Sequence, residues 1–318
     1  MIENGIFLGI DTSNYTTSVA VLDCEGRLLA NIKYPLQVKS GEHGLRQSDA
    51  VFSHIKNLPF AMSDAGAVIG DRKILAVGVS ERPRNVEGSY MPCFLSGVAA
   101  AISFATAAKT PLFRFSHQCG HLMAALYSSE RFDLLDKEFV AFHVSGGTTE
   151  MLKVFPEDNG FKAEHIGGTR DLNAGQVIDR IGVMMDMPFP AGRHMEISAI
   201  ENKQKVPKKK VSQDGLWINL SGLENMAKKL YDETSDKSLT SAFVLDYVGN
   251  SLSKISEAYE EQFGKNEFVF SGGVMSNSII KAKIKERFKA SFAEPMLSAD
   301  NAVGIAYLAF RAYSNKNI

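Results

Sequence analysis

The segment that most constrains the fold has two apolar runs on either side of a pair of glycines. Residues 139–154 read Phe-Val-Ala-Phe-His-Val-Ser-Gly-Gly-Thr-Thr-Glu-Met-Leu-Lys-Val. The apolar arms are typical of β-strands, and Gly146 and Gly147 are typical of a turn that needs a positive φ. Consecutive N–H groups in such a turn can cradle phosphate oxygens, because no Cβ atoms cover them. An ordinary β-hairpin gives the same pattern.

The same layout recurs twice in the chain. Residues 5–22 repeat the apolar strand, polar turn and apolar strand, and residues 268–277 repeat the strand and its two glycines, Gly272 and Gly273. The last copy leads into a helix-like run over 278–288 instead of a second strand. This repetition predicts an α/β fold of two lobes, each with one phosphate loop.

The length of 318 residues favours one large or two medium domains. We place an N-terminal lobe at residues 1–112 plus 302–318 and a C-terminal lobe at residues 113–301. The formal net charge of −1 gives no global attraction for nucleic acid, so an RNA partner would need a local basic patch.

Three cysteines, Cys24, Cys93 and Cys119, lie far apart with no CxxC pair, which argues against a disulfide framework or a thiolate zinc site. Residues 91–108 carry no charge but are rich in small residues, so we expect a buried helix and not a membrane span. No secretory signal is evident at the start. These features predict a cytoplasmic protein without a membrane partner.

The remaining elements follow from apolar spacing. A helix beginning at Asp49 is expected to bury Val51, Phe52, Ile55 and Leu58, with His54 near the edge of that face in a structural role. Residues 166–181 are interpreted as a loop leading into a helix. Further strands are expected at 28–34, 74–79 and 111–115, and further helices at 196–202, 241–263 and 300–313.

Histidines form the clearest candidate for a metal site. His117 and His121 follow a strand and are four residues apart, so on a helix both imidazoles face the same way and can share one ion. His143, at the end of the central strand, supplies a third imidazole. Asp300 lies at a loop-to-helix junction, where it can bind metal or cap the helix. Gln118 stands where the HExxH metalloproteases have their glutamate base, which excludes that mechanism.

Several charged residues have two interpretations. Arg82 and Arg84, in the loop after a strand, either contact a carboxylate or phosphate or pair with Glu87 to shape the loop. Asp171 and Asp179 either reach ribose hydroxyls or a magnesium ion, or are ordinary helix-start and surface charges. Five lysines within residues 203–210 form either a solvated loop or a patch for RNA.

Taken together, these motifs resemble the TsaD/Kae/Gcp family of tRNA threonylcarbamoyl transferases, over about residues 6 to 310. Residues 117–121 match the family's HxxxH, 144–150 its VSGGxTQ, 271–277 its AGGVxxN and 298–301 its TDN. Residues 171–179 resemble DDAAGEAxDK, Gly192 falls at the PGG turn, and 221–223 match SGLK in part. The family has the actin-like fold of sugar kinases and chaperone ATPases.

The resemblance implies one iron or zinc ion bound by His117, His121 and Asp300, with His143 as a further ligand, acting as a Lewis acid. It also implies an adenine nucleotide, as ATP, ADP or threonylcarbamoyl-AMP. The implied partners are tRNA and proteins of the threonylcarbamoylation pathway, in a homodimer or heterodimer. The implied nucleotide contacts are Ser145, Gly146, Gly147, Thr148, Asp171, Gly175, Asp179, Gly192, Gly273 and Asn277.

The chain also departs from the family's pattern. The family's ETSCDET is here Asp-Thr-Ser-Asn-Tyr-Thr-Thr at 11–17, so Tyr15 and Thr16 replace an acidic pair, and residues 82–92 replace the GPGL loop. The residues left to assist transfer are Asp11, Ser13, Arg82 and Arg84. Two alternatives therefore stand beside transfer to tRNA: a related carbamoyl transferase or nucleotide hydrolase with another substrate, and a non-catalytic nucleotide-binding paralogue.

Overall fold

A computed structural model describes residues 4–13, 15–37, 45–158, 160–298 and 301–316. The chain forms two compact units. Unit 1 comprises residues 1–136, 155–162 and 297–318, and unit 2 comprises residues 137–154 and 163–296. No helix among the described residues is both long and apolar enough to cross a bilayer.

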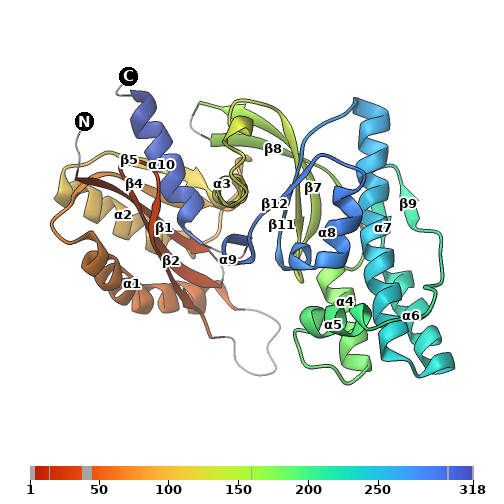
Figure 1. Cartoon of the computed structure of the whole chain (residues 1–318). Helices are drawn as coiled ribbons and strands as arrows, with labels where there is room; N and C mark the ends of the chain where they lie inside the picture. Colours follow the sequence, from red (N-terminus) through yellow and green to blue (C-terminus); the bar gives the residue numbers. More distant parts are fainter. Residues whose placement is uncertain (1–3, 14, 38–44, 159, 299–300, 317–318) are drawn as a thin grey trace. The chain divides into compact units, whose positions relative to one another are not determined.

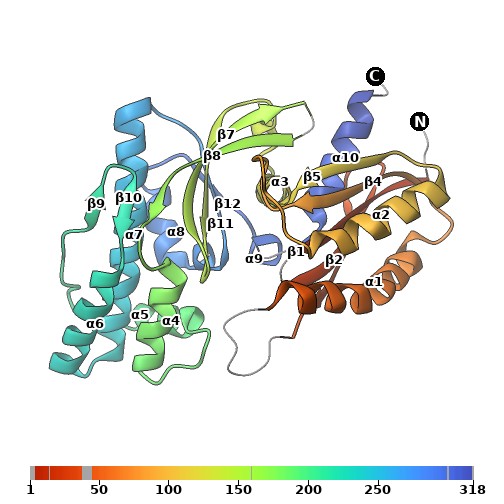
Figure 2. The same cartoon turned by 180° about the vertical axis from the view of Figure 1, so that it is seen from behind.

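Unit 1 is built on a five-stranded sheet with the order β3-β2-β1-β4-β5. The first three strands form the predicted antiparallel meander, and β4 and β5 add in parallel. Helices α1 and α2 cover one face, seen in Figure 2, and α10 covers the other, seen in Figure 1. The elements are β1 (Gly5–Ser13), β2 (Thr16–Asp23), β3 (Leu28–Pro35), α1 (Gln47–Ile69), β4 (Lys73–Arg82), α2 (Phe94–Ala108), β5 (Leu112–Ser116), α3 (His117–Ser128), a 3₁₀ turn (Phe132–Leu134) and α10 (Val303–Lys316).

Unit 2 contains most of a seven-stranded sheet with the order β12-β11-β6-β7-β8-β10-β9, and its core joins the central strands to α4–α8. The point where β7 passes into β8 is grouped with unit 1. The elements are β6 (Phe139–Val144), β7 (Thr149–Glu157), β8 (Gly160–Thr169), α4 (Ala174–Met184), α5 (Gly192–Ile200), β9 (Ser212–Asp214), β10 (Trp217–Asn219), α6 (Ser221–Thr234), α7 (Lys237–Phe263), β11 (Phe268–Ser271), a 3₁₀ turn (Gly273–Ser276), α8 (Ser278–Lys285) and β12 (Ala290–Phe292), followed by the short α9 (Pro295–Ser298).

The glycine motif behaves differently in its two copies. The predicted hairpin of β6 and β7 is confirmed, with Val144 opposite Thr149 across the turn. The predicted positive φ at Gly146 and Gly147 is wrong, because neither residue is in the left-handed region. In the other copy Gly272 has φ +98°, and a Cβ there would lie 2.3 Å from the carbonyl oxygen of Val144. Of these three glycines, only Gly272 is therefore required by the backbone geometry.

Two further expectations are corrected. Strand β8 occupies residues 160–169, part of which was expected to be loop. Helix α1 forms as predicted, but Phe52 and Ile55 are 64% and 56% exposed, whereas His54 is fully buried. Half of the buried residues of α1 are alanines, which allow a close approach to the sheet, and the others are Leu58, Ile69 and His54.

Candidate functional site

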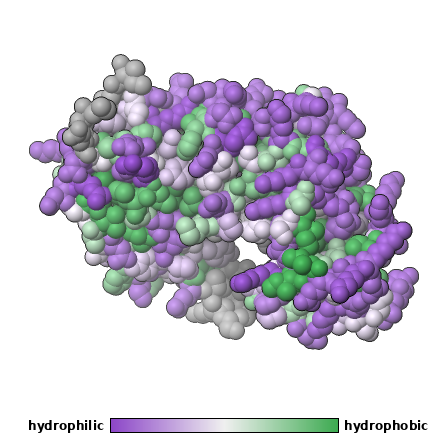
Figure 3. Space-filling view, in the orientation of Figure 1, coloured by the Kyte–Doolittle hydropathy of each residue, from purple (hydrophilic) through white to green (hydrophobic). Residues whose placement is uncertain are grey.

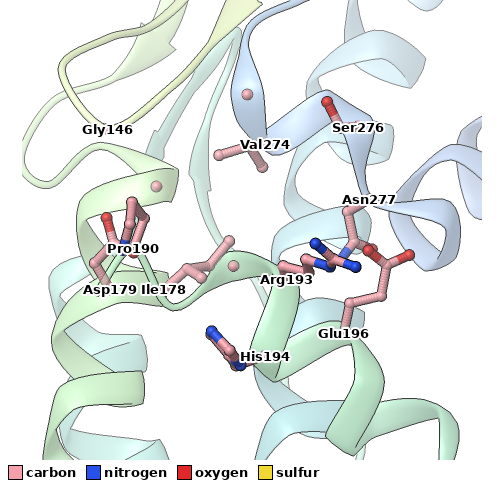
Figure 4. A pocket seen from close by; sticks show the side chains of 13 residues that line it. Gly146, Ile178, Asp179, Pro190, Arg193, His194, Glu196, Val274, Ser276 and Asn277 are labelled. Carbon is pink, nitrogen blue, oxygen red and sulfur yellow. The ribbon is translucent and has the colours of Figure 1, made fainter. Parts of the chain in front are cut away.

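Unit 2 contains a cavity of about 680 Å³ between the glycine turns and helices α4, α5 and α8 (Figure 4). Six of the predicted nucleotide residues line it: Gly146, Gly175, Asp179, Gly192, Gly273 and Asn277. Ser145, Gly147, Thr148 and Asp171 do not. Seven further residues line the cavity that were not predicted as nucleotide contacts: Ile178, Pro190, Arg193, His194, Glu196, Val274 and Ser276.

The turn between β6 and β7 is held from both sides. The N–H of Ser145 donates to the carbonyl of Thr148 at 2.7 Å, and the Ser145 hydroxyl accepts the N–H of Thr148 at 3.1 Å. The N–H of Gly175, in the first turn of α4, donates to the carbonyl of Ser145 at 3.1 Å. A Cβ at Gly175 would lie 2.7 Å from the Gly146 nitrogen, so this glycine allows the helix to approach the turn.

Open space lies above the two turn glycines. A Cβ on Gly146 or Gly147 would meet nothing within 4 Å, and neither residue donates its N–H to a partner within the described parts of the chain. The same openness is found at Gly273, on the other side of the cavity. N–H groups of a turn that lack a partner among the described residues, beside an empty volume, can form a cradle that binds phosphate oxygens.

On the other walls of the cavity, the side chains of Asp179 and Asn277 hold the backbone in place through hydrogen bonds. Asp179 Oδ1 accepts the N–H of Ala191 at 2.8 Å, which ties α4 to the segment before α5, and its Oδ2 has no hydrogen-bond partner among the described residues. Asn277 caps α8, since its Oδ1 accepts the N–H groups of Ile279 and Ile280 at 3.1 Å. A carboxylate oxygen with remaining acceptor capacity suits ribose hydroxyls or an exocyclic amine.

Arg193 adds positive charge to this cavity. It makes no ion pair or hydrogen bond with the part of the chain that the structure describes, and Figure 4 shows its guanidinium beside the side chains of Glu196 and Asn277. Glu196 is already engaged, because its Oε1 accepts the N–H of Ser278 at 2.6 Å. The guanidinium is therefore available to an anionic ligand.

Asp171 supports the backbone instead of lining the cavity. Its carboxylate accepts the N–H groups of Leu172, Leu220 and Ser221 at 2.6, 2.7 and 3.0 Å. Partial burial alone would raise the pKa of Asp171, but the hydrogen bonds from Ser221 and from the backbone outweigh it and lower this pKa to about 2. Asp171 thereby joins the end of β8 to the start of α6.

Replacing Asp171 by asparagine is expected to lower the free energy of unfolding by about 1 kcal/mol at pH 7, a value discounted because the carboxylate is exposed. The folded pKa lies below the unfolded value of about 3.9, so the carboxylate stabilises the fold fully above that value and loses its effect as pH falls towards 2. Urea denaturation at pH 7 and pH 3 should show the difference between wild type and variant shrinking in acid. An equal difference at both pH values would contradict this role.

In unit 1, two histidine side chains converge at the start of α3. His117 Nδ1 lies 2.7 Å from Oδ2 of Asp11, and His117 Nε2 lies 2.9 Å from Nε2 of His121. Asp11 is fully buried at the end of β1, and its Oδ1 also accepts the N–H of Ser13 at 2.8 Å. Ser116 caps α3 by accepting the N–H of Cys119, which fixes the first turn of the helix.

This arrangement fits a metal site. Asp11 accepts the proton of His117 Nδ1, so the lone pair of that ring is on Nε2 and points at Nε2 of His121. A carboxylate that orients the outer nitrogen of a metal-binding histidine is a common arrangement in metal sites. The described residues contain no group of three His, Cys, Asp or Glu side chains that could hold an ion, and Asp300 lies outside them.

The other predicted site residues have these positions. His143, on β6 of unit 2, has Nδ1 at 3.2 Å from the hydroxyl of Ser271. Arg82 pairs with Glu81 at 2.6 Å, and not with Glu87 as the alternative interpretation expected. Arg84 is exposed and its N–H donates to the Ser89 hydroxyl at 3.0 Å. The Ser13 hydroxyl is buried without a hydrogen-bond partner among the described residues.

Comparison with known proteins gives one consistent family. Residues 35–307 match the family described as tRNA N6-adenosine threonylcarbamoyltransferase. Proteins of that name from Streptococcus suis and Streptococcus mutans are 30% and 31% identical to this chain. The alignments cover 100% and 96% of this chain and 95% and 92% of the relatives.

Solved structures are similar at the level of the fold. HypF from T. kodakarensis has a TM-score of 0.60 at 14% identity over 98% of this chain and 48% of its own. The activator of 2-hydroxyisocaproyl-CoA dehydratase from Clostridium difficile, solved with bound ADPNP, has a TM-score of 0.52 at 13% identity over 98% of both chains. These similarities, with the two units that the chain forms, confirm the predicted two-lobed α/β fold.

Proposed function

The chain belongs to the tRNA N6-adenosine threonylcarbamoyltransferase family, and we propose that it moves a threonylcarbamoyl group from its adenylate to an adenosine of tRNA. The observation that carries this proposal is the cavity of unit 2, which is lined by six of the ten residues predicted to bind the nucleotide. It is large enough for an adenylate, since ligand pockets commonly span about 300–1,000 Å³. A tRNA substrate supports the proposal that the protein acts in the cytoplasm.

The geometry supports a specific division of roles in adenylate binding. Gly146 and Gly273 carry no side chain into the open space beside the cavity and so leave room for the phosphate, and Arg193 can neutralise part of its charge. The remaining oxygen of Asp179 suits a ribose hydroxyl. A magnesium ion beside Asp179 stays a prediction.

We propose that His117 and His121, together with Asp300, hold one transition-metal ion. Imidazole and carboxylate ligands suit iron and zinc alike. Such an ion would polarise a carbonyl oxygen of the transferred group as a Lewis acid. Asp11 then acts as a positioning residue, because it holds His117 in the tautomer whose Nε2 is open to metal.

The assay of choice supplies threonylcarbamoyl adenylate, tRNA and the pathway's partner proteins to the full chain. Wild type is expected to produce modified adenosine. Gly146→Val is expected to raise the Kd for the adenylate at least about tenfold, which is about 1.4 kcal/mol, since the new side chain enters the cavity. The assay measures modified nucleoside by mass spectrometry and adenylate binding by calorimetry.

Gly66→Val is the matched control, because its side chain also meets open space but lies in α1 of unit 1, away from the cavity. It should bind the adenylate as wild type does. No modified adenosine from wild type with all partners present would reject the proposed function and favour a non-catalytic paralogue. The other alternative, a related carbamoyl transferase or nucleotide hydrolase with another substrate, is weakened because Arg82, one of the two arginines that favoured it, is paired with Glu81.

A further inference from the structure

An ordered segment of unit 2 displays an unusual concentration of positive charge. Residues 203–210, here called the lysine strap, run from the end of α5 to β9 (Figure 1) and contain Lys203, Lys205, Lys208, Lys209 and Lys210. All five lysines are exposed. The side of unit 2 on which β9 lies is covered mostly by hydrophilic residues (Figure 3).

The backbone of the strap is fixed to the body of unit 2. Val206, and Val211 just after the strap, pack against the core of this unit. The hydroxyl of Tyr247 donates to the carbonyl of Lys210 at 3.4 Å, and the Gln204 amide donates to Asp236 at 2.6 Å. The lysines therefore project from a main chain that these contacts hold in place.

The strap is not neutralised within the protein. None of its five lysines forms an ion pair within the described residues. Elsewhere in unit 2, Lys254 pairs with Glu257 and Lys283 with Asp246. Holding five like charges together without counter-charges is unfavourable, so the arrangement suits a polyanion supplied from outside.

We propose that the lysine strap binds the phosphate backbone of the tRNA, an inference that rests on the proposed function. Eight residues span up to about 26 Å when extended, enough to contact several phosphates. Lysines act here as point charges, and none of the strap residues is aromatic, so the expected contacts position the RNA without reading bases.

The strap and the adenylate cavity lie at opposite ends of one helix. Gly192 and Arg193, at the start of α5, line the cavity, and the strap follows the helix's last residue, Ile200. Nine helical residues measure about 13 Å, and α5 is fixed by its buried Met195 and Ala199. The start of the strap is therefore separated from the cavity's edge by little more than the length of this short helix.

The test replaces Lys208, Lys209 and Lys210 together by glutamine in the full chain. Fluorescence anisotropy with tRNA is expected to show a Kd raised about tenfold at moderate salt. The slope of log Kd against log salt should fall by about 2 to 3, since each lost phosphate contact contributes about 0.7–0.9. The KM for tRNA in the transfer assay should rise, with the Kd for adenylate and the Tm unchanged.

The control replaces Lys254, Lys265 and Lys289 by glutamine, which removes the same charge from exposed positions elsewhere in unit 2. Its Kd for tRNA should stay within about twofold of wild type. Equal losses in both triple variants, or an unchanged salt slope in the strap variant, would overturn the proposal. So would strap-dependent binding to phosphatidylserine vesicles with tRNA binding intact, which indicates a membrane surface.

The two proposals fail in different ways. If the wild type transfers the group and the strap variant has the same KM for tRNA, the proposed role of the strap in tRNA binding is refuted. The proposed function then still stands. If the wild type transfers nothing but binds tRNA in a way that depends on the strap, the proposed role of the strap is supported. The proposed function is then refuted.

Discussion

Replacing His117 by alanine is expected to remove the bound metal ion and to lower threonylcarbamoyl transfer on the order of a hundredfold or more. The Nε2 atoms of His117 and His121 lie 2.9 Å apart and point at one another, so each ring depends on the other to hold an ion. Metal analysis of the purified full chain by mass spectrometry, together with the transfer assay, measures both effects.

This variant also disturbs the interior of unit 1. The fully buried Asp11 loses a hydrogen bond of 2.7 Å, which is expected to cost about 1–3 kcal/mol of folding free energy. His121→Ala is the cleaner comparison, since it removes one imidazole without breaking the bond to Asp11. It should lose the metal as His117→Ala does, with a smaller change in Tm.

The Asp11→Asn variant tests the orientation of His117 separately from metal binding by the two imidazoles. Both nitrogens of the histidine pair remain, but the amide no longer provides a charged acceptor for His117 Nδ1, so metal affinity is expected to fall by about 10- to 100-fold. Chelator competition measures this affinity. Stoichiometric metal that survives in both histidine variants would refute the site and leave Asp11 and His117 as a buried structural pair.

The local elements of this fold could be predicted because their signals are local. The arms of residues 139–154 are apolar and short, and they pair as β6 and β7 in the register that a tight turn allows. Strand β8 was missed in part because its last residues include the pair Gly167 and Gly168, which is typical of a loop.

The face of a helix depends on what packs against it, and this information is not local. In α1 the large side chains of Phe52 and Ile55 are exposed, and the imidazole of His54 is buried with Nδ1 at 2.8 Å from the Thr17 hydroxyl. Arg193 was missed for a related reason. It matches no motif, and only the packing of α5 against α4 and α7 brings it to the cavity.

Replacing Gly272 by alanine is expected to destabilise unit 2 by at least about 3 kcal/mol. The residue has φ +98°, and its new Cβ would lie 2.3 Å from the carbonyl oxygen of Val144. Val144 ends the central strand β6, which is paired with both β7 and β11, so it cannot move aside cheaply. The Tm should fall by about 6–12 °C, measured by thermal denaturation.

Gly273→Ala provides the comparison at the next residue. Its Cβ would meet nothing within 4 Å and its φ is not positive, so the free energy of unfolding should change by less than about 0.5 kcal/mol. The sequence presents the two glycines as one motif, whereas the structure gives them separate tasks: Gly272 permits the close contact with β6, and Gly273 leaves the cavity open. Equal destabilisation by the two substitutions would instead mean that both glycines serve the turn itself.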